Sequence, residues 1–250
     1  KDFMFHYAED NSPARTYAKH CHFLYEAYLL IEGEINYVIA GETFALKSGN
    51  MLLIPPAVFH RAEITAAGKP YRRAVMIFAP PPGFSDKKRP LLYRENAEIR
   101  ALFDRLLSYA DRLDGSELDA IAAAYPTELM ILLNHVSPVE TLDPVNEADM
   151  PGVVRKAVAF INDRLAEDFT LDDVAEAADV SKHYICHAFG KTVGEGVMEY
   201  ARHRKLEEAR LLIEAGIRPG KAAAKMGFDN YTTFYRAYKR FYGQAPRPRG

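Results

Sequence analysis

Three histidines and one glutamate near the start of the chain have the types and spacing of a metal-ligand set. His20 and His22 are separated by one residue, Glu26 follows them, and His60 comes later. Side chains two residues apart on a β-strand point to the same face, so a later strand that brings His60 to that face completes the set. Three imidazoles and one carboxylate suit Fe, Mn, Ni or Zn. The alternative is that these groups hydrogen-bond to one another, or to a small ligand, without a metal.

The elements that must position these residues are predicted to be β-strands. Residues 1 to about 85 contain runs rich in Tyr, Leu, Ile and Val, separated by glycine and proline at intervals of roughly 8–12 residues, which is typical of an all-β barrel or sandwich. Counting by twos from the histidines places Tyr28 on the inward face as well. Because a barrel interior is the usual place for a small-molecule effector, the predicted effector-binding residues are His20, His22, Glu26, Tyr28 and His60.

Two adjacent arginines interrupt the last apolar run of this region. Arg72 and Arg73 lie between Tyr71 and Phe78. An arginine that points inward would suit an anionic effector, whereas one on the outer face is solvated.

The same spacing resembles the two sequence motifs of the cupins. The first motif is matched by His20, His22, Glu26 and Gly33, and the second by Gly49, Pro55, Ala57 and His60. The resemblance implies a double-stranded β-helix barrel, and it includes the four positions that hold a divalent metal in metallo-cupins. Ala57 stands where the fuller pattern has glycine. Regulators with this barrel often keep the pattern without a metal.

Two copies of a helix-turn-helix pattern occupy the C-terminal part of the chain. The first runs from Leu171 to Lys191 and the second from Lys221 to Lys239, and placing Ala175 on Ala223 gives an offset of 48 residues. Ser181 is the predicted N-cap of the second helix in the first copy. In the second copy, either Asp229 or Asn230 is the cap.

Helical periodicity divides the second helix of each copy into an inner and an outer face. The inner face is predicted to hold Tyr184, Ile185, Ala188 and Phe189 in the first copy, and Phe234, Ala237 and Tyr238 in the second. The outer faces then present Lys182, His183, Cys186, His187, Tyr231, Thr232, Tyr235, Arg236 and Lys239. Residues 197–215 form an uninterrupted helical pattern of about 28 Å at about 1.5 Å per residue. This is close to the ~34 Å between successive major-groove faces of DNA.

The charge distribution supports nucleic-acid binding by this region. The whole chain has 32 Lys and Arg against 34 Asp and Glu, a net charge of −2. From Ser181 to the end, however, 14 basic residues stand against 6 acidic ones, a net charge of +8. The positive charge therefore lies on the two outer faces and the segment that joins them, where DNA phosphates require it.

The last hundred residues resemble the C-terminal domain of the AraC family of bacterial transcription regulators. The matching segments are VAEAADVS at 174–181, KLEEARLLI at 205–213, Gly227-Phe228, Phe234-Tyr235-Arg236 and GQAP at 243–246. The resemblance implies that the two outer faces enter successive major grooves, and that Lys205 contacts a phosphate or supports its helix. Gly190 replaces a lysine or arginine that is usual in the family. The implied partners are double-stranded promoter or operator DNA, a small-molecule effector, RNA polymerase and a second copy of the chain.

Together these patterns predict a two-domain α+β protein. An N-terminal cupin barrel with following helices precedes an all-α domain of two helix-turn-helix motifs joined by a long helix. The predicted domains are residues 1–85 for effector binding, 86–150 for helical dimerisation and linkage, and 151–250 for DNA binding. Predicted helices at 94–113 and 118–136 resemble the dimerisation segment of the family, although their apolar face could instead pack on the barrel.

The expected function is sequence-specific transcription regulation controlled by a small molecule in the barrel, with no catalysis and no required cofactor. The alternatives are a metal-dependent cupin enzyme and a metal-sensing regulator, both using His20, His22, Glu26 and His60. The two cysteines, Cys21 and Cys186, form no disulfide framework and suit a reducing cytosol. No apolar run approaches a membrane span, and the N-terminus has no signal-peptide core. The expected location is therefore the bacterial cytoplasm, in association with the nucleoid.

Overall fold

The computed structural model divides the chain into two compact units. The first contains Lys1–Thr16 and Phe23–Val145, and the second contains Tyr17–His22 and Asn146–Gly250. The structure describes residues 3–10, 15–17, 19–39, 42–64, 70–84, 87, 89–110, 112–113, 117, 120, 124–141, 150–214, 216–243 and 245–247. None of the helices in these ranges combines the length and hydropathy that a membrane span requires.

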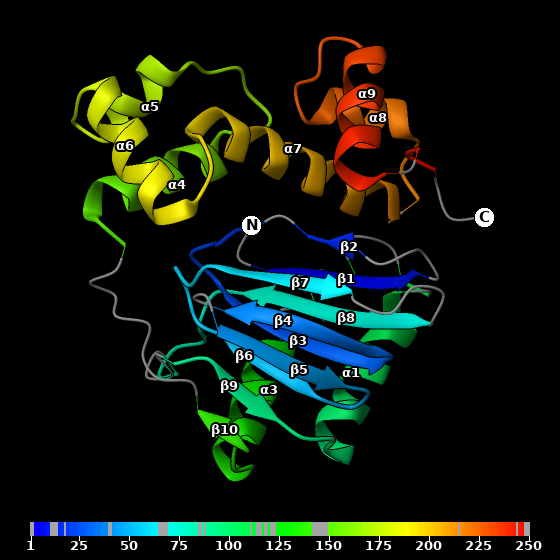
Figure 1. Cartoon of the computed structure of the whole chain (residues 1–250). Coiled ribbons are helices and arrows are strands. Elements are labelled where there is room, and N and C mark those ends of the chain that lie inside the picture. The colour runs from blue at the N-terminus through cyan, green and yellow to red at the C-terminus, as the bar shows by residue number, and fades with distance from the viewer. Residues whose placement is uncertain are drawn as a thin grey trace. The chain divides into compact units, whose positions relative to one another are not determined.

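In its described residues, the first unit consists of two antiparallel β-sheets with the helices α1 and α3 (Figure 1). Its elements are β1 (Phe3–Asp10), β2 (Arg15–Thr16), β3 (Tyr25–Glu32), β4 (Glu34–Ile39), β5 (Glu42–Lys47), β6 (Met51–Ile54), β7 (His60–Ile64), β8 (Tyr71–Phe78), β9 (Leu91–Tyr93), α1 (Ala97–Ala110), α3 (Tyr125–His135) and β10 (Glu140–Thr141). One sheet has the order β1-β8-β3-β6-β9-β10 and the other has the order β2-β7-β4-β5. The predicted α+β class with an N-terminal β domain is confirmed.

The tight connection between β3 and β4 requires a glycine. Gly33 has a φ of +113°, and a Cβ at this position would lie 2.7 Å from the carbonyl oxygen of Pro70. Any other residue would therefore combine backbone strain with a clash. This connection turns the chain from the first sheet into the second, and so places β4 opposite β3.

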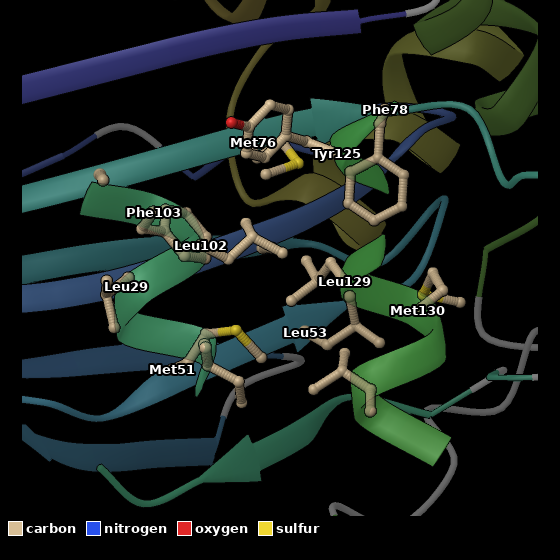
Figure 2. Close-up of a cluster of buried hydrophobic side chains, with 14 of the residues drawn as sticks. Leu29, Met51, Leu53, Met76, Phe78, Leu102, Phe103, Tyr125, Leu129 and Met130 are labelled. Carbon is tan, nitrogen blue, oxygen red and sulfur yellow. The ribbon is translucent and has the colours of Figure 1, made fainter. Parts of the chain in front are cut away.

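The main hydrophobic core of this unit lies between the larger sheet and the two helices (Figure 2). Leu102 and Phe103 of α1 and Leu129 of α3 are fully buried against the strands. The strands contribute alternate residues to this core, namely Ala27 and Leu29 from β3, Met51 and Leu53 from β6, and Ala74, Met76 and Phe78 from β8. The apolar face of the predicted dimerisation helices is thus packed against the larger sheet of the same chain.

The helix boundaries differ from the predicted ones. The helix expected at 94–113 spans Ala97–Ala110, because Asn96 accepts hydrogen bonds from the backbone N–H groups of Glu98 and Ile99 and so caps its start. The helix expected at 118–136 is described from Tyr125 to His135. Residues 118, 119 and 121–123 of that prediction lie outside the described residues.

The regular elements described between residues 150 and 247 of the second unit are helices. Its helices are α4 (Gly152–Asp163), α5 (Leu171–Ala177), α6 (Lys182–Val193), α7 (Val197–Glu214), α8 (Pro219–Lys225) and α9 (Tyr231–Tyr242). Figure 1 shows α7 as the long helix that joins the α5–α6 pair to the α8–α9 pair. The helix predicted at 197–215 is confirmed as far as Glu214, and residue 215 lies outside the described residues.

Candidate functional site

The structure places the four residues of the predicted metal-ligand set in both units. Glu26 and His60 lie in the first unit, and His20 and His22 lie in the second. Glu26 is 4% exposed and His60 is 1% exposed, so both are almost completely buried. Within the first unit, these two side chains are the potential metal ligands of the predicted set.

Hydrogen bonds fix the orientation of the two buried members. Nδ1 of His60 donates to the carbonyl oxygen of Val58 at 2.8 Å, because a carbonyl oxygen can only accept. In the neutral imidazole this leaves the lone pair on Nε2, which lies 3.4 Å from Oε2 of Glu26. The hydroxyl of Tyr37 donates to the other carboxylate oxygen of Glu26 at 2.8 Å. A ligand set held by such surrounding bonds is pre-oriented.

The loop before His60 carries a strained residue. Ala57 has a φ of +64°, in the left-handed region that residues with a Cβ rarely adopt. This conformation explains why the cupin pattern has glycine there.

The two remaining histidines lie in the Tyr17–His22 segment of the second unit. Nδ1 of His20 lies 3.8 Å from Oε2 of Glu207 on α7, and the ring centroids of His20 and His22 are 6.1 Å apart. The carbonyl oxygen of Cys21, between them, accepts a hydrogen bond from Nδ2 of Asn162 at 3.2 Å. Burial raises the pKa of the Cys21 thiol to about 12, so this thiol stays protonated.

Of the two arginines in β8, only one is buried. Arg73 is 7% exposed, and its Nη1 donates to the hydroxyl of Tyr71 at 2.8 Å. Arg72 lies on the opposite face with a side chain 42% exposed, and it pairs with Glu32. Tyr28, predicted to face inward, is 3% exposed, and its hydroxyl shares a short hydrogen bond with that of Tyr71.

Sequence reasoning missed Tyr37 and Tyr71 as members of this interior. Strand alternation carries the signal for both residues, since Tyr37 lies between the buried Ile35 and Ile39, and Tyr71 lies two residues before Arg73. Burial raises the pKa of Tyr37 well above its usual value, and the negative charge of Glu26 raises it further. Tyr37 therefore remains a hydrogen-bond donor at neutral pH.

The two helix-turn-helix copies have the same local geometry. The turn contains Asp179 with a φ of 58° in the first copy and Gly227 with a φ of 70° in the second. In each, the residue after the turn donates back to the buried alanine, from Val180 to Ala175 at 3.0 Å and from Phe228 to Ala223 at 3.1 Å. These positions all keep the predicted offset of 48 residues.

The second helices follow an offset of 49, because the second turn contains one additional residue. Ser181 caps α6 by accepting from Tyr184 N at 3.2 Å, and Asn230 caps α9 by accepting from Thr233 N at 2.8 Å. Of the two predicted caps, Asn230 is therefore the one used.

The outer faces are polar and exposed, as a DNA-reading helix requires. The side chains of Lys182, His183, Cys186, His187, Tyr231, Thr232, Arg236 and Lys239 are exposed, and that of Tyr235 is partly buried. The inward prediction for Tyr184 is wrong, since it is 53% exposed. Ile185 and Phe189, spaced four apart, already fill the inner face of α6 and are completely buried, which leaves Tyr184 on the solvent side.

The side chain of Lys205 contacts other residues of the helical unit. Its Nζ donates to the carbonyl oxygen of Glu167 at 2.9 Å and lies 5.9 Å from the centroid of the Phe169 ring. Of the two roles implied for this residue, helix support matches these contacts.

Comparisons with known proteins agree with both halves of this arrangement. A family model described as an AraC-like ligand binding domain matches residues 3–130, and one described as a helix-turn-helix domain matches residues 174–248. The chain is 25% identical over 229 residues to the arabinose operon regulatory protein of Salmonella typhimurium, covering 86% of this chain and 78% of that protein. It is also 25% identical over 240 residues to an HTH-type transcriptional regulator, YobQ, of Bacillus subtilis, covering 96% of this chain and 91% of that protein.

Solved structures show the same fold. An apo form of a ToxT variant from Vibrio cholerae matches with a TM-score of 0.60 at 13% identity, covering 98% of this chain and 96% of that one. Wild-type ToxT bound to an unsaturated fatty acid matches with a TM-score of 0.57 at 12% identity, covering 98% and 93%.

Proposed function

The chain belongs to the AraC family of DNA-binding transcription regulators, and from this premise we propose that it binds specific promoter sequences under the control of a small molecule held between its two β-sheets. The family consists of transcription factors and not enzymes, so the metal-dependent enzyme is set aside. We also propose that the boundary predicted between residues 150 and 151 separates effector binding from DNA binding.

The observation that carries this proposal is the repeated helix-turn-helix with two outward polar helices. The proposed base and phosphate contacts are Lys182, His183, Cys186 and His187 on α6, and Tyr231, Thr232, Tyr235, Arg236 and Lys239 on α9. Both helices begin with a side-chain cap, and the N-terminal residues of a recognition helix are the ones that reach base edges. The net charge of +8 from Ser181 onward supplies attraction to phosphates.

Selection from a random duplex library tests sequence-specific binding. We expect the enriched duplex to bind about 1,000-fold more tightly than a scrambled duplex in gel shifts at one fixed salt concentration. Equal affinity for the two duplexes would contradict the proposal. An effector is then recognised as a small molecule that binds the protein and changes the affinity for the enriched duplex by at least about fivefold.

We also propose that the chain acts as a homodimer that contacts RNA polymerase. One chain offers a single pair of recognition helices, whereas operators bound by dimers repeat the half-site. Light scattering coupled to gel filtration would give twice the chain mass of 28.2 kDa for the dimer. The dimer would be excluded if the protein has the mass of one chain by itself and if its complex has the mass of one chain plus one duplex.

A metal-sensing regulator is a second candidate, favoured by the donor side chains of the predicted ligand set and by the bonds that orient two of them. His20, His22, Glu26 and His60 fit Zn, Ni, Fe or Mn by donor type, and the bonds from His60 to Val58 and from Tyr37 to Glu26 supply the surrounding support. A bound metal would link these side chains, and the chain's own residues would orient the ligands around it.

Metal analysis by mass spectrometry of untagged protein, purified without chelator, tests this candidate. The candidate is supported if the protein holds about one equivalent of metal per chain, and if this metal content falls in His22→Ala but not in His203→Ala. His203 is a suitable control because its Nδ1 pairs with Glu195 at 2.7 Å on the helical unit. Stoichiometric metal should also shift DNA affinity several-fold, so a binding curve that is insensitive to chelator would exclude metal sensing.

A further inference from the structure

The interior of the first unit contains buried charged groups that are not part of its main hydrophobic core. Among the described residues of this unit, the buried acidic, basic and histidine side chains are Glu26, His60 and Arg73. Ala27 and Ala74, their strand neighbours, belong to the core beneath the helices. Because side chains alternate along a strand, Glu26 and Arg73 lie on the other face of that sheet, toward the second sheet.

Contacts between the two sheets confirm where this face points. Tyr37 and His60 come from β4 and β7 of the smaller sheet, and both approach Glu26 of β3 in the larger sheet, at 2.8 Å and 3.4 Å. The rings of Tyr28 and Tyr37 also meet edge to face across the gap, with centroids 4.8 Å apart. The side chains therefore lie between the sheets.

These groups form one continuous series, which we call the interior polar array. It consists of Arg73, Tyr71, Tyr28, Tyr37, Glu26 and His60. The array begins at the Arg73 guanidinium and reaches Tyr28 through the hydroxyl of Tyr71. The ring contact between Tyr28 and Tyr37 continues it to the carboxylate of Glu26 and the imidazole of His60. Arg73 of β8 lies opposite Leu30 of β3, and Leu30 is four residues from Glu26 on the same strand. The Arg73 end and the Glu26 end of the array are therefore about 13 Å apart along the strand.

An apolar interior would be the simpler way to join two sheets. Burying a guanidinium and a carboxylate removes both from water, and replacing such groups with packed apolar residues is often neutral or stabilising. The surrounding interior positions, such as Ile35, Ile39 and Leu52, are apolar and buried. Charged groups gathered in an apolar interior are the usual mark of a ligand-recognition site.

We propose that the interior polar array binds a hydroxylated carboxylic acid, with the acid group of the ligand on Arg73. This inference rests on the proposed function, because it assigns a chemical class to the effector. A planar guanidinium binds a carboxylate through two parallel hydrogen bonds. The tyrosine hydroxyls, Glu26 and His60 then exchange hydrogen bonds with ligand hydroxyls. Glu26 repels an anion, which directs the acid group to the distant Arg73 end.

A ligand panel with matched chemistry tests the class. Lactate, malate, tartrate, gluconate and glucuronate would be titrated by calorimetry into the full chain, beside glycerol, sorbitol and glucose as neutral hydroxyl compounds and butyrate and hexanoate as acids without hydroxyls. We expect at least one hydroxy acid to bind, and its neutral and hydroxyl-free counterparts to bind at least about tenfold more weakly. Binding by no hydroxy acid, or equal binding by a neutral counterpart, would overturn the proposal.

The adjacent arginines supply a matched pair of variants. Arg73→Gln should weaken binding of the hydroxy acid by about tenfold to a hundredfold, the effect of losing a charged hydrogen-bonded pair. Arg72→Gln changes the same residue type on the opposite face of the same strand, where the side chain is 42% exposed, and should leave binding unchanged. If Arg73→Gln fails to fold, Tyr71→Phe, which keeps the ring and removes one hydroxyl of the array, should weaken binding severalfold. Unchanged affinity in Arg73→Gln, or in Tyr71→Phe if Arg73→Gln does not fold, would overturn the assignment.

DNA binding distinguishes the failure of this inference from the failure of the proposed function. A hydroxy acid that binds through Arg73 without changing affinity for the enriched duplex would leave the ligand class standing and contradict effector control. A neutral compound that changes DNA affinity, when no hydroxy acid binds, would leave effector control standing and contradict the ligand class.

Discussion

The hydroxyl of Tyr37 donates to Oε1 of Glu26 at 2.8 Å, and this bond joins the two β-sheets of the first unit. Both side chains are almost fully buried, so water cannot replace either partner. The bond thus has two consequences, one for the stability of the β-sheet unit and one for the ligand that the carboxylate can accept.

Removing this hydroxyl should destabilise the protein. Tyr37→Phe keeps the ring packing against Tyr28 but deprives a buried carboxylate of a donor, at a cost of about 1–3 kcal/mol in the free energy of unfolding. Tyr7→Phe is the matched control, because Tyr7 also donates to a carboxylate, that of Glu9, in an exposed setting at 3.2 Å. The control should cost less than about 0.5 kcal/mol. Urea unfolding measures both, and equal losses would contradict a special role for the buried pair.

Buried tyrosines predict a loss of stability at alkaline pH. Burial raises the pKa of Tyr93 to about 12 and raises those of Tyr37, Tyr200 and Tyr242 above their usual value of 10.0. The folded state therefore keeps protons that the unfolded state releases above pH 10, so stability is full below pH 10 and falls as the pH rises toward the folded pKa values. Melting temperatures between pH 8 and 12 should show this decline, accompanied by a late step in tyrosinate absorbance. Complete ionisation of all 15 tyrosines near pH 10, with the fold intact, would disprove it.

Strand alternation predicted which side chains of β3 point into the β-sheet unit, because residues two apart on a strand share a face. It placed Glu26 and Tyr28 inside correctly. It did not reveal that Ala27 and Leu29, on the opposite face, are buried too, since α1 and α3 cover that face. A sheet covered on both faces loses the polar alternation from which a single buried face is recognised. The bond between Tyr37 and Glu26 also escaped prediction, because it depends on how β4 lies across from β3.

The helical unit was more predictable from sequence because its contacts are local. Caps, turns and helix faces depend on residues three or four apart, so the Ser181 cap and the long α7 were both identified. Tyr184 was misplaced because a tyrosine near the start of an amphipathic helix fits either face. Asn230 rather than Asp229 is the cap because the second turn contains one additional residue. The length of this turn is visible only in the backbone structure.

Two glycines in the helical unit should respond to substitution in opposite directions. Gly190 lies inside α6, where an added Cβ meets nothing within 4 Å, so Gly190→Ala should stabilise the protein by about 0.5–1 kcal/mol. Gly227 has a φ of +70°, and a Cβ there would lie 2.7 Å from the carbonyl oxygen of Ala166. Gly227→Ala should therefore destabilise by about 1–3 kcal/mol. Thermal unfolding of the two variants compares them, and a shift of the same sign in both would refute the assigned turn geometry.

The two basic residues on α9 should differ in what they read. Arg236 lies nearer the start of the helix, where side chains reach base edges, whereas Lys239 lies in the last turn and is placed for a phosphate. Arg236→Ala should reduce affinity for the enriched duplex by about 1–3 kcal/mol and affect the scrambled duplex much less. Lys239→Ala should weaken both duplexes alike and lower the slope of log affinity against log salt by about one.

The control for both changes is Arg100→Ala, which removes an exposed arginine that pairs with Asp104 on α1 at 2.9 Å. This variant loses the same positive charge from the β-sheet unit, so a general effect of net charge on DNA binding would appear in it as well. We expect it to keep both the affinity and the salt dependence of the unmodified protein, since its arginine lies outside the proposed interface. Equal weakening by Arg100→Ala and Arg236→Ala would mean that charge alone, and not a recognition helix, determines binding. If instead Arg236→Ala loses discrimination and Lys239→Ala loses salt dependence, α9 reads bases with one residue and holds the backbone with the other.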